Sequence, residues 1–371
     1  MPKNQNWLRV DRLSLRFRVF VSLSVIFALP LPLRASLALP LSLALSMSLA
    51  LPISVSLSLA LPLPSLGEQP WTPQRARATL ERARRLGREM SQKDTDELFA
   101  AAERMSYYDY IRESQEVLKL VCNSKYARAE HFCMLADSYS TTIGDIDANK
   151  VIQQHLNRAI KLDPKNSHAW NSLAEMATKD GDVKKALEYS NKAVDTGKSK
   201  PFELCHLTRA IILANLKRYK DALDCILLAE KDLPYRAEVY RVKASTLENL
   251  NRYDEAVTAY RHAYQLQKQD WTIYQIARCL DKAGKYKEAI AEVDTLIKLS
   301  PQDADAYRAR SALKVKLKDI NGAISDISKA IEQEPTTKSY QERARLYKQI
   351  GKNDLASKDE AAAHKIMDSP F

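Results

Sequence analysis

Glycine is scarce in this sequence: only 8 of the 371 residues are glycine. Loops that cradle phosphate groups need several closely spaced glycines, because only glycine readily adopts the left-handed backbone conformations they contain. We therefore do not expect nucleotide binding through such a loop. Leucine, alanine, lysine, glutamate and arginine dominate after residue 70, and these residues favour helices.

Catalytic and metal-binding motifs are also missing. No G-x-x-x-x-G-K, G-x-S-x-G or H-E-x-x-H string occurs, and the six histidines are scattered along the chain. The five cysteines are odd in number and show no C-x-x-C spacing, so we expect them to pack as small apolar side chains. The sequence gives no reason to expect an enzyme, a metal site or a cofactor.

Positive charge is concentrated at one end of the chain. The formal net charge is +11, and twelve basic against four acidic side chains in residues 1–90 account for +8 of it. The remaining 281 residues are nearly neutral, so the folded body offers no basis for nucleic-acid binding. A helical-repeat RNA-binding protein, which would need a continuous basic stripe, is therefore disfavoured.

Residues 1–35 have the pattern of a signal peptide or signal anchor. Five basic side chains in residues 1–18 precede the uncharged apolar run Val19–Leu33. Residues 36–69 form a low-complexity segment of Leu, Ser, Ala and Pro, and the uncharged stretch Ala35–Gly67 is long enough to cross a bilayer of ~30 Å as a helix. Four prolines between residues 40 and 64 interrupt it.

Three interpretations of this segment stay open. It is a signal peptide or uncleaved anchor, an apolar tail on a cytosolic protein, or the product of a mis-called start codon. The first implies an exported (periplasmic or secreted) or membrane-anchored protein, and the other two a cytoplasmic one. Residues 70–94 predict a basic helix and linker, which either meets anionic lipid headgroups or caps the fold that follows.

An internal repeat determines the fold. The strings YKDAL, YDEAV and YKEAI begin at Tyr219, Tyr253 and Tyr286, and the alanine in each belongs to a series with a spacing of 33 to 36 residues. A second small residue recurs seven positions after most members of that series. The first series comprises Ala186, Ala222, Ala256, Ala289, Ala323 and Ala356, and the second Ala159, Ala193, Ala229, Ala263, Ala330 and Ala363, with Leu296 as an exception.

Each repeat unit predicts two helices. The first carries apolar residues at helical spacing, a break marked by Gly181, Asn251, Gly284 or Gly351 follows, and the second carries both alanines. Alanine suits these positions because helices packed 8–10 Å apart leave no room for a larger side chain where they cross.

These features resemble the tetratricopeptide repeat family, which has a 34-residue unit. Ser167–Val194 and Ala306–Pro335 match the family pattern nearly throughout. The resemblance covers 95–371 and implies an all-α solenoid of about eight helix-turn-helix units forming a right-handed superhelix. The units are expected near 95–128, 129–166, 167–202, 203–236, 237–269, 270–303, 304–336 and 337–367.

Two ion pairs are predicted within the last two units. Unit position 7 is arginine and position 23 is aspartate in both, and paired helices bring these positions together. We therefore expect pairs between Arg310 and Asp326 and between Arg343 and Asp359. If half-exposed, each would contribute only ~0–1 kcal/mol.

The resemblance places unit positions 2, 5, 9 and 12 on a concave face that binds partners. Arginine, tryptophan and tyrosine there are residue types that often dominate interfaces. The candidate partner-binding residues are Trp271, Tyr274, Arg278, Arg308, Arg241 and Arg345. An open alternative is that Trp271 and Tyr274 only pack against a neighbouring unit.

The expected function is a non-catalytic scaffold, exported or membrane-tethered, that binds a protein or peptide of unknown identity. The alternative is a cytosolic adaptor or co-chaperone-like regulator with a spurious N-terminal extension. Some family members clamp acidic chaperone tails through Lys, Asn, Lys and Arg at positions 5, 9, 2 and 6. Asn171, Glu175, Arg241 and Ser245 depart from that set, so this specialised role is not supported. The sequence does not indicate the oligomeric state.

Overall fold

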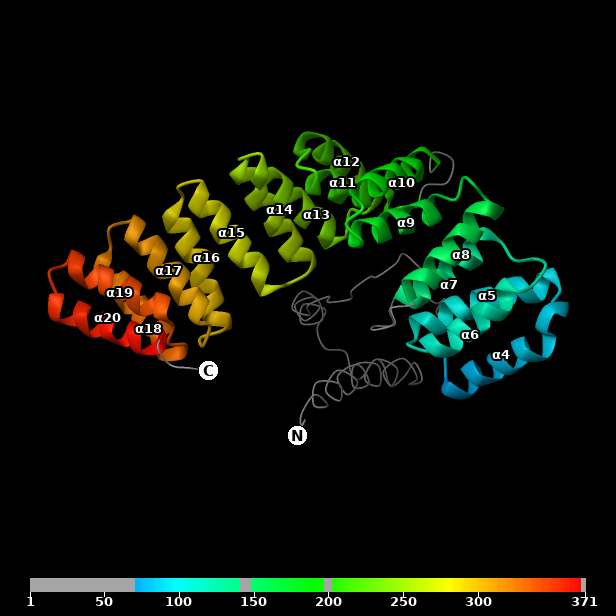
Figure 1. Ribbon diagram of the computed structural model, residues 1–371, viewed down its shortest axis with the longest axis horizontal. Coiled ribbons are helices and arrows are strands. Elements are labelled where there is room, and N and C mark those ends of the chain that lie inside the picture. The colour runs from blue at the N-terminus through cyan, green and yellow to red at the C-terminus, as the bar shows by residue number, and fades with distance from the viewer. Residues whose placement is uncertain (1–70, 141–147, 197–201, 368–371) are drawn as a thin grey trace, which may run out of the picture. The chain divides into compact units, whose positions relative to one another are not determined.

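A computed structural model describes residues 71–140, 148–196 and 202–367, and every regular element in these ranges is a helix (Figure 1). This confirms the all-α solenoid. None of these helices is both long and apolar enough to cross a membrane. The predicted signal-like and low-complexity segments, 1–35 and 36–69, lie outside the described residues.

Eight helix pairs follow one another along the described chain, as the sequence repeat predicts. They are preceded by helix α4 (Pro73–Leu86) and a short 3-10 turn (Gly87–Glu89). The pairs are α5 (Gln92–Tyr107) with α6 (Ile111–Cys122), α7 (Ala129–Ser140) with α8 (Ala148–Leu162), α9 (Ser167–Lys179) with α10 (Val183–Thr196), α11 (Cys205–Asn215) with α12 (Tyr219–Asp232), α13 (Ala237–Asn249) with α14 (Tyr253–Leu266), α15 (Asp270–Lys282) with α16 (Tyr286–Leu299), α17 (Ala304–Lys316) with α18 (Ile320–Gln333), and α19 (Thr337–Gln349) with α20 (Asn353–Met367).

A single left-handed residue ends the first helix of each of the last six pairs. Glycine is favoured there because it adopts positive φ without a steric penalty. Asparagine tolerates the conformation, but the two lysines in the series carry its strain. The residues are Gly181, Lys217, Asn251, Gly284, Lys318 and Gly351, with φ between 60° and 76°.

The repeated alanines are buried where helices cross. Every alanine of the two series that define the repeat is at most 2% exposed. Leu296, which replaces one of them, is also buried. Close packing of neighbouring helices at these points explains why the sequence keeps a small residue there.

The apolar core is a succession of clusters, each shared by neighbouring pairs. One joins residues of α11, α12, α13 and α14 around Ile226 and Val239. The next joins residues of α13 to α17 around Ile276 and Val293. Each pair packs mainly on its neighbours. The free energy of unfolding is therefore expected to be the sum of the stabilities of the single pairs and of the interfaces between neighbouring pairs.

Both predicted ion pairs are present and have two-pronged geometry. Arg310 donates to Asp326 at 2.9 and 2.6 Å, and Arg343 donates to Asp359 at 2.8 and 2.7 Å. The aspartate side chains are only 4% and 8% exposed. They are therefore more buried than the half-exposed case, and breaking either pair leaves a buried carboxylate with fewer or no compensating cations.

Candidate functional site

All six candidate partner-binding residues lie on the first helices of their pairs. Ion pairs also connect consecutive first helices. Glu248 of α13 binds Arg278 and Lys282 of α15, and Asp281 of α15 binds Lys316 of α17. First helices therefore lie side by side in this region. We call the surface formed by the exposed side chains of α13, α15, α17 and α19 the first-helix face.

Three of the six candidates occupy unit position 5 and bind the linker that leads to the next pair. They are Arg241, Tyr274 and Arg308. Arg241 donates to Gln267 and Gln269 at 3.0 and 3.3 Å, in the linker between α14 and α15. The hydroxyl of Tyr274 donates to Asp303 at 2.6 Å, just before α17. The same position therefore makes the same kind of contact in two successive units.

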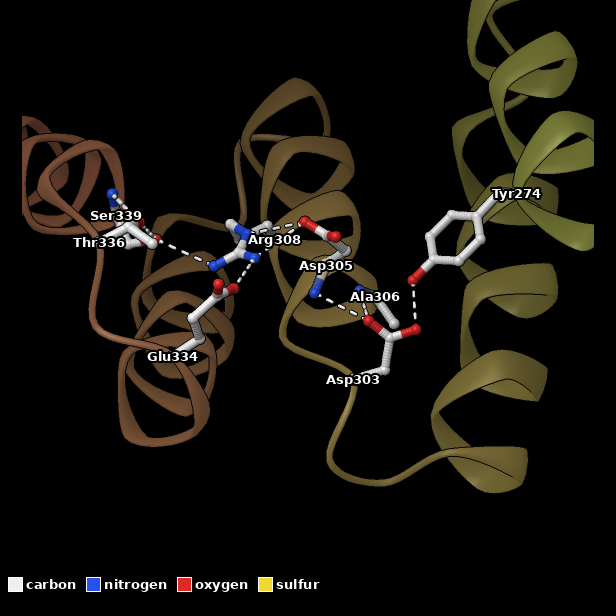
Figure 2. Close-up of polar contacts among 8 residues, drawn as sticks. All are labelled: Tyr274, Asp303, Asp305, Ala306, Arg308, Glu334, Thr336 and Ser339. Carbon is white, nitrogen blue, oxygen red and sulfur yellow. Dashed lines mark hydrogen bonds and ion pairs between the residues drawn. The ribbon is translucent and has the colours of Figure 1, made fainter. Parts of the chain in front are cut away.

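The linker contacts of Tyr274 and Arg308 flank α17 (Figure 2). Asp303 accepts from Tyr274 while its other oxygen caps α17 by accepting from the amides of Asp305 and Ala306 at 2.9 and 3.2 Å. Arg308 reaches in the other direction, to Glu334 at 2.6 Å. These contacts fix the start of one first helix and its distance from the next.

The other three candidates, Trp271, Arg278 and Arg345, remain substantially exposed. The exposed fractions are 44%, 52% and 57%. The Trp271 indole donates to Gln269 at 2.8 Å, which fixes the ring orientation while leaving much of its surface accessible. Among the described residues, Arg345 pairs with Glu342 alone, one turn earlier on α19, at 2.7 Å. An exposed pair of this kind contributes ~0–1 kcal/mol and is easily exchanged.

Glu248 is the most buried carboxylate between two first helices. It is 8% exposed and accepts from Arg278 at 2.7 Å and from Lys282 at 2.9 Å. Burial opposes its ionisation, but the hydrogen bonds from Lys282 and Arg278 outweigh burial and lower the pKa of Glu248 below its ordinary value of 4.5. Two cations on one carboxylate leave positive charge at the surface beside Arg278.

Unit position 9 gives the first-helix face its chemical character. Ser245, Arg278, Ala312 and Arg345 occupy this position in the last four units, and all four are exposed. Small side chains therefore alternate with arginines along a row that crosses four helices. The row offers space for a polypeptide backbone next to cationic hydrogen-bond donors.

The same position is different in the earlier units. Glu175 accepts from Asn171 at 2.9 Å and from Thr208 at 3.2 Å, which connects α9 to α11. Ile211 of α11 is half-buried. The cationic character is therefore confined to the later part of the described array.

The ion pairs between repeats that hold the face together were not predicted from the sequence. Lys282 and Lys316 both sit at unit position 13, and the acids Glu248 and Asp281 both sit at position 12 of the preceding unit. This repeated acid–lysine relationship, about 34 residues apart, was a detectable signal. The linker residues Gln267, Gln269 and Glu334 have no equivalent repeated pattern.

No metal-binding arrangement is found among the described residues, where no group of three or more His, Cys, Asp or Glu side chains could hold an ion. The five cysteines are free thiols, and all but Cys122 are buried. Burial raises the pKa of the Cys205 and Cys279 thiols to about 12. Such thiols are poor nucleophiles, in agreement with a packing role.

Comparison with known families agrees with the helix pairs. Models of the tetratricopeptide repeat match residues 155–188 and 250–313, which span all or part of five of the pairs. The chain contains tetratricopeptide repeats. The helix bounds extend the repeat on both sides of the matched segments.

The protein is also similar to two curated plant proteins. It is 28% identical over 195 residues to the Hsp70-Hsp90 organizing protein of Triticum aestivum, covering 50% of this chain and 33% of the relative. It is 28% identical over 189 residues to Hsp70-Hsp90 organizing protein 1 of Glycine max, covering 49% and 32%. The chain thus spans about a third of the length of these relatives.

Among solved structures, this tetratricopeptide repeat protein is similar to PilF of Pseudomonas aeruginosa. The identity is 21%, the TM-score is 0.46, and the match covers 58% of this chain and 95% of the other. A tetratricopeptide repeat protein from Parabacteroides merdae gives 19% identity and a TM-score of 0.45, covering 64% and 92%.

Proposed function

We propose that the protein is a non-catalytic scaffold that binds a peptide or protein segment along the first-helix face. The observation that carries this proposal is the exposure of Trp271, Arg278 and Arg345. The position-5 side chains bind the linkers, whereas these three stay exposed on the first helices α15 and α19. A large aromatic with nearby arginines is a combination that often dominates protein interfaces.

The chemistry of the face favours an extended segment with acidic residues and at least one apolar side chain. Ala312 leaves space for the backbone between the two arginines, and Ser245 leaves space on the other side of Arg278. The ion pair between Arg345 and Glu342 is weak because it is exposed. Arg345 can therefore leave Glu342 and bind a carboxylate of the partner instead. The apolar side chain of the partner would cover the exposed ring of Trp271.

The partner chemistry is tested by selecting peptides from a display library on the immobilised full chain. The dissociation constant of a selected peptide is then compared with that of Trp271→Ala/Arg345→Gln. We expect at least a tenfold weakening, because an aromatic anchor and a charge-assisted hydrogen bond are both lost. The matched control is Leu299→Ala/Lys287→Gln, which alters an exposed apolar and an exposed basic residue on α16. Equal affinities for the two variants would contradict the proposal.

We further propose that the N-terminal segment tethers this scaffold to a membrane or directs its export. The support is the order of a basic region, an apolar run and a long uncharged stretch in residues 1–67. Fractionation of cells expressing the full chain tests this part separately. Recovery with membranes that resists alkaline extraction, or recovery outside the cytosol, supports it. Recovery in the cytosolic fraction alone would overturn it.

A second candidate function is a cytosolic adaptor of the co-chaperone kind. The similarity to the two plant Hsp70-Hsp90 organizing proteins favours it, and on this view the partner is an Hsp70 or Hsp90 chaperone. Glu175 opposes an acidic chaperone tail on α9, because it places a carboxylate in a hydrogen-bond network with Asn171 and Thr208. Binding of purified Hsp70 or Hsp90 that is lost with Trp271→Ala/Arg345→Gln would favour this candidate.

A further inference from the structure

Helix α4 and the turn that follows it carry several exposed arginines. Arg77, Arg85 and Arg88, the last in the turn that follows the helix, are exposed and form no ion pair with the described residues. Arg84 lies between them and pairs with Glu81 of the same helix at 3.1 Å. We call these four arginines the α4 arginine row.

Helix α4 is held against the first helix pair by its buried residues. Ala76, Leu80 and Ala83 are buried in a cluster that includes Leu98 and Val117 of that pair. One further arginine of α4 is held away from the row. Arg82 turns toward α5, where it binds Asp94 at 2.7 Å and Glu97 at 2.8 Å. The row is therefore a rigidly presented surface and not part of a loose tail.

A role as a solubilising cap does not explain the large excess of positive over negative charge on α4. A terminal helix of a repeat array needs only a polar outer side. At the other end of the described array, α20 meets that need with two lysines against three acidic residues in Asn353–Met367. Helix α4 carries five arginines and one glutamate in Pro73–Leu86. The excess of positive charge on α4 therefore favours an anionic partner.

The position of α4 in the chain indicates which anionic partner. The uncharged stretch Ala35–Gly67 ends six residues before α4 begins at Pro73. Six residues span at most about 20 Å when fully extended. Where the end of this apolar stretch at Gly67 contacts a bilayer, the start of α4 is therefore held within that distance of the same surface.

We propose that the α4 arginine row binds the anionic headgroups of a phospholipid bilayer and so orients the repeat array on the membrane; this rests on the proposed tether. Basic side chains next to a membrane-inserted segment are attracted by anionic lipid, and each contributes about fivefold to binding near the surface. Three arginines without a described partner would contribute roughly ten- to a hundredfold after allowance for salt screening. Phosphates of a nucleic acid share this charge, but the adjoining apolar stretch favours the bilayer.

The test is flotation of the full chain with vesicles of two compositions. One is pure phosphatidylcholine and the other also contains phosphatidylglycerol. Wild type is compared with Arg77→Gln/Arg85→Gln/Arg88→Gln. The control Lys231→Gln/Lys298→Gln/Lys358→Gln removes the same charge from exposed sites on α12, α16 and α20. Unchanged circular dichroism melting of both variants confirms that folding is intact.

We expect wild type and control to bind anionic vesicles about ten- to a hundredfold more strongly than neutral ones, with the difference shrinking as salt rises. The α4 variant should lose most of this difference and keep its binding to neutral vesicles. Equal preference of wild type and α4 variant for anionic vesicles overturns the proposal.

Binding to neutral vesicles measures the contribution of the apolar segment alone. It therefore distinguishes a failure of the proposed tether from a failure of the arginine row. Absence of neutral binding together with an α4-dependent anionic preference would reject only the tether. A single-stranded RNA probe is included in parallel. If the α4 variant loses RNA binding while vesicle binding is unaffected, the bilayer proposal is overturned in favour of a nucleic acid.

Discussion

Arg310 joins two neighbouring repeats through one guanidinium group. It binds Asp326 of its own repeat at 2.9 and 2.6 Å, and its third nitrogen binds Asp294 of the preceding repeat at 2.6 Å. Arg343 repeats the arrangement one unit later, with Ser328 in place of Asp294. Position 7 of these units thus connects the second helices of successive pairs.

Removing the Arg310 side chain should be costly. Arg310→Ala leaves Asp326, which is 4% exposed, with Lys314 at 2.8 Å as its remaining cation. We expect a loss of about 2–4 kcal/mol in the free energy of unfolding, because breaking a buried pair leaves a poorly compensated charge. Urea unfolding measures this. The control Arg252→Ala breaks an exposed pair with Glu255 and should cost ~0–0.5 kcal/mol. Similar losses in both variants would show that the buried pair of Arg310 stabilises the protein no more than an exposed pair does.

The helix crossings should not accept a larger side chain. Ala256 is fully buried at such a crossing. Ala256→Leu should destabilise the protein by about 1–3 kcal/mol, since extra methyl groups force the helices apart. Ala291→Leu on the exposed side of α16 is the matched control and should be nearly neutral. The thermal midpoints of the two variants decide the question, and a neutral Ala256→Leu would refute close packing at this point.

Replacing a strained lysine should stabilise the array. Lys318 ends α17 with a φ of 62°, where Gly284 and Gly351 stand in neighbouring units. Lys318→Gly should raise the free energy of unfolding by about 0.5–1 kcal/mol, because the steric strain relieved exceeds the entropic cost of glycine. Lys318→Ala keeps a Cβ and should give no such gain. Stabilisation by both substitutions would point to loss of the lysine charge instead.

The contact between α13 and α15 should weaken in acid. The pKa of Glu248 is lowered in the folded protein, so its ionised form stabilises the fold above its ordinary value of 4.5. That contribution is lost as the pH falls below 4.5 and through the lowered value. Glu248→Gln should therefore be less stable than wild type at neutral pH, and the difference should shrink below pH 4.5. Urea unfolding at several pH values checks this, and a difference independent of pH would exclude the titration of Glu248 as the cause.

The repeat and its internal ion pairs were predictable because they recur. The alanine spacing fixes the helix pairs, and a position-7 arginine opposite a position-23 aspartate predicts the pair of Arg310 and Asp326. The contact with Asp294 was not predicted, because it depends on how far one pair is offset from the next. Similarly, residue type placed Arg241, Tyr274 and Arg308 among the partner-binding candidates, whereas the structure directs them to the linkers. Where a position-5 side chain points depends on linker residues that do not repeat.

The first-helix face is tested most directly by photo-crosslinking from two alanines. Ala312 is exposed in the position-9 row of α17, and Ala291 is exposed on the second helix α16. A photoreactive phenylalanine analogue is introduced at each position in the full chain, and a peptide selected on the wild-type protein is added. The account predicts crosslinking to the peptide from position 312 and little or none from position 291. Crosslinking from position 291 alone, or equally from both, would contradict it.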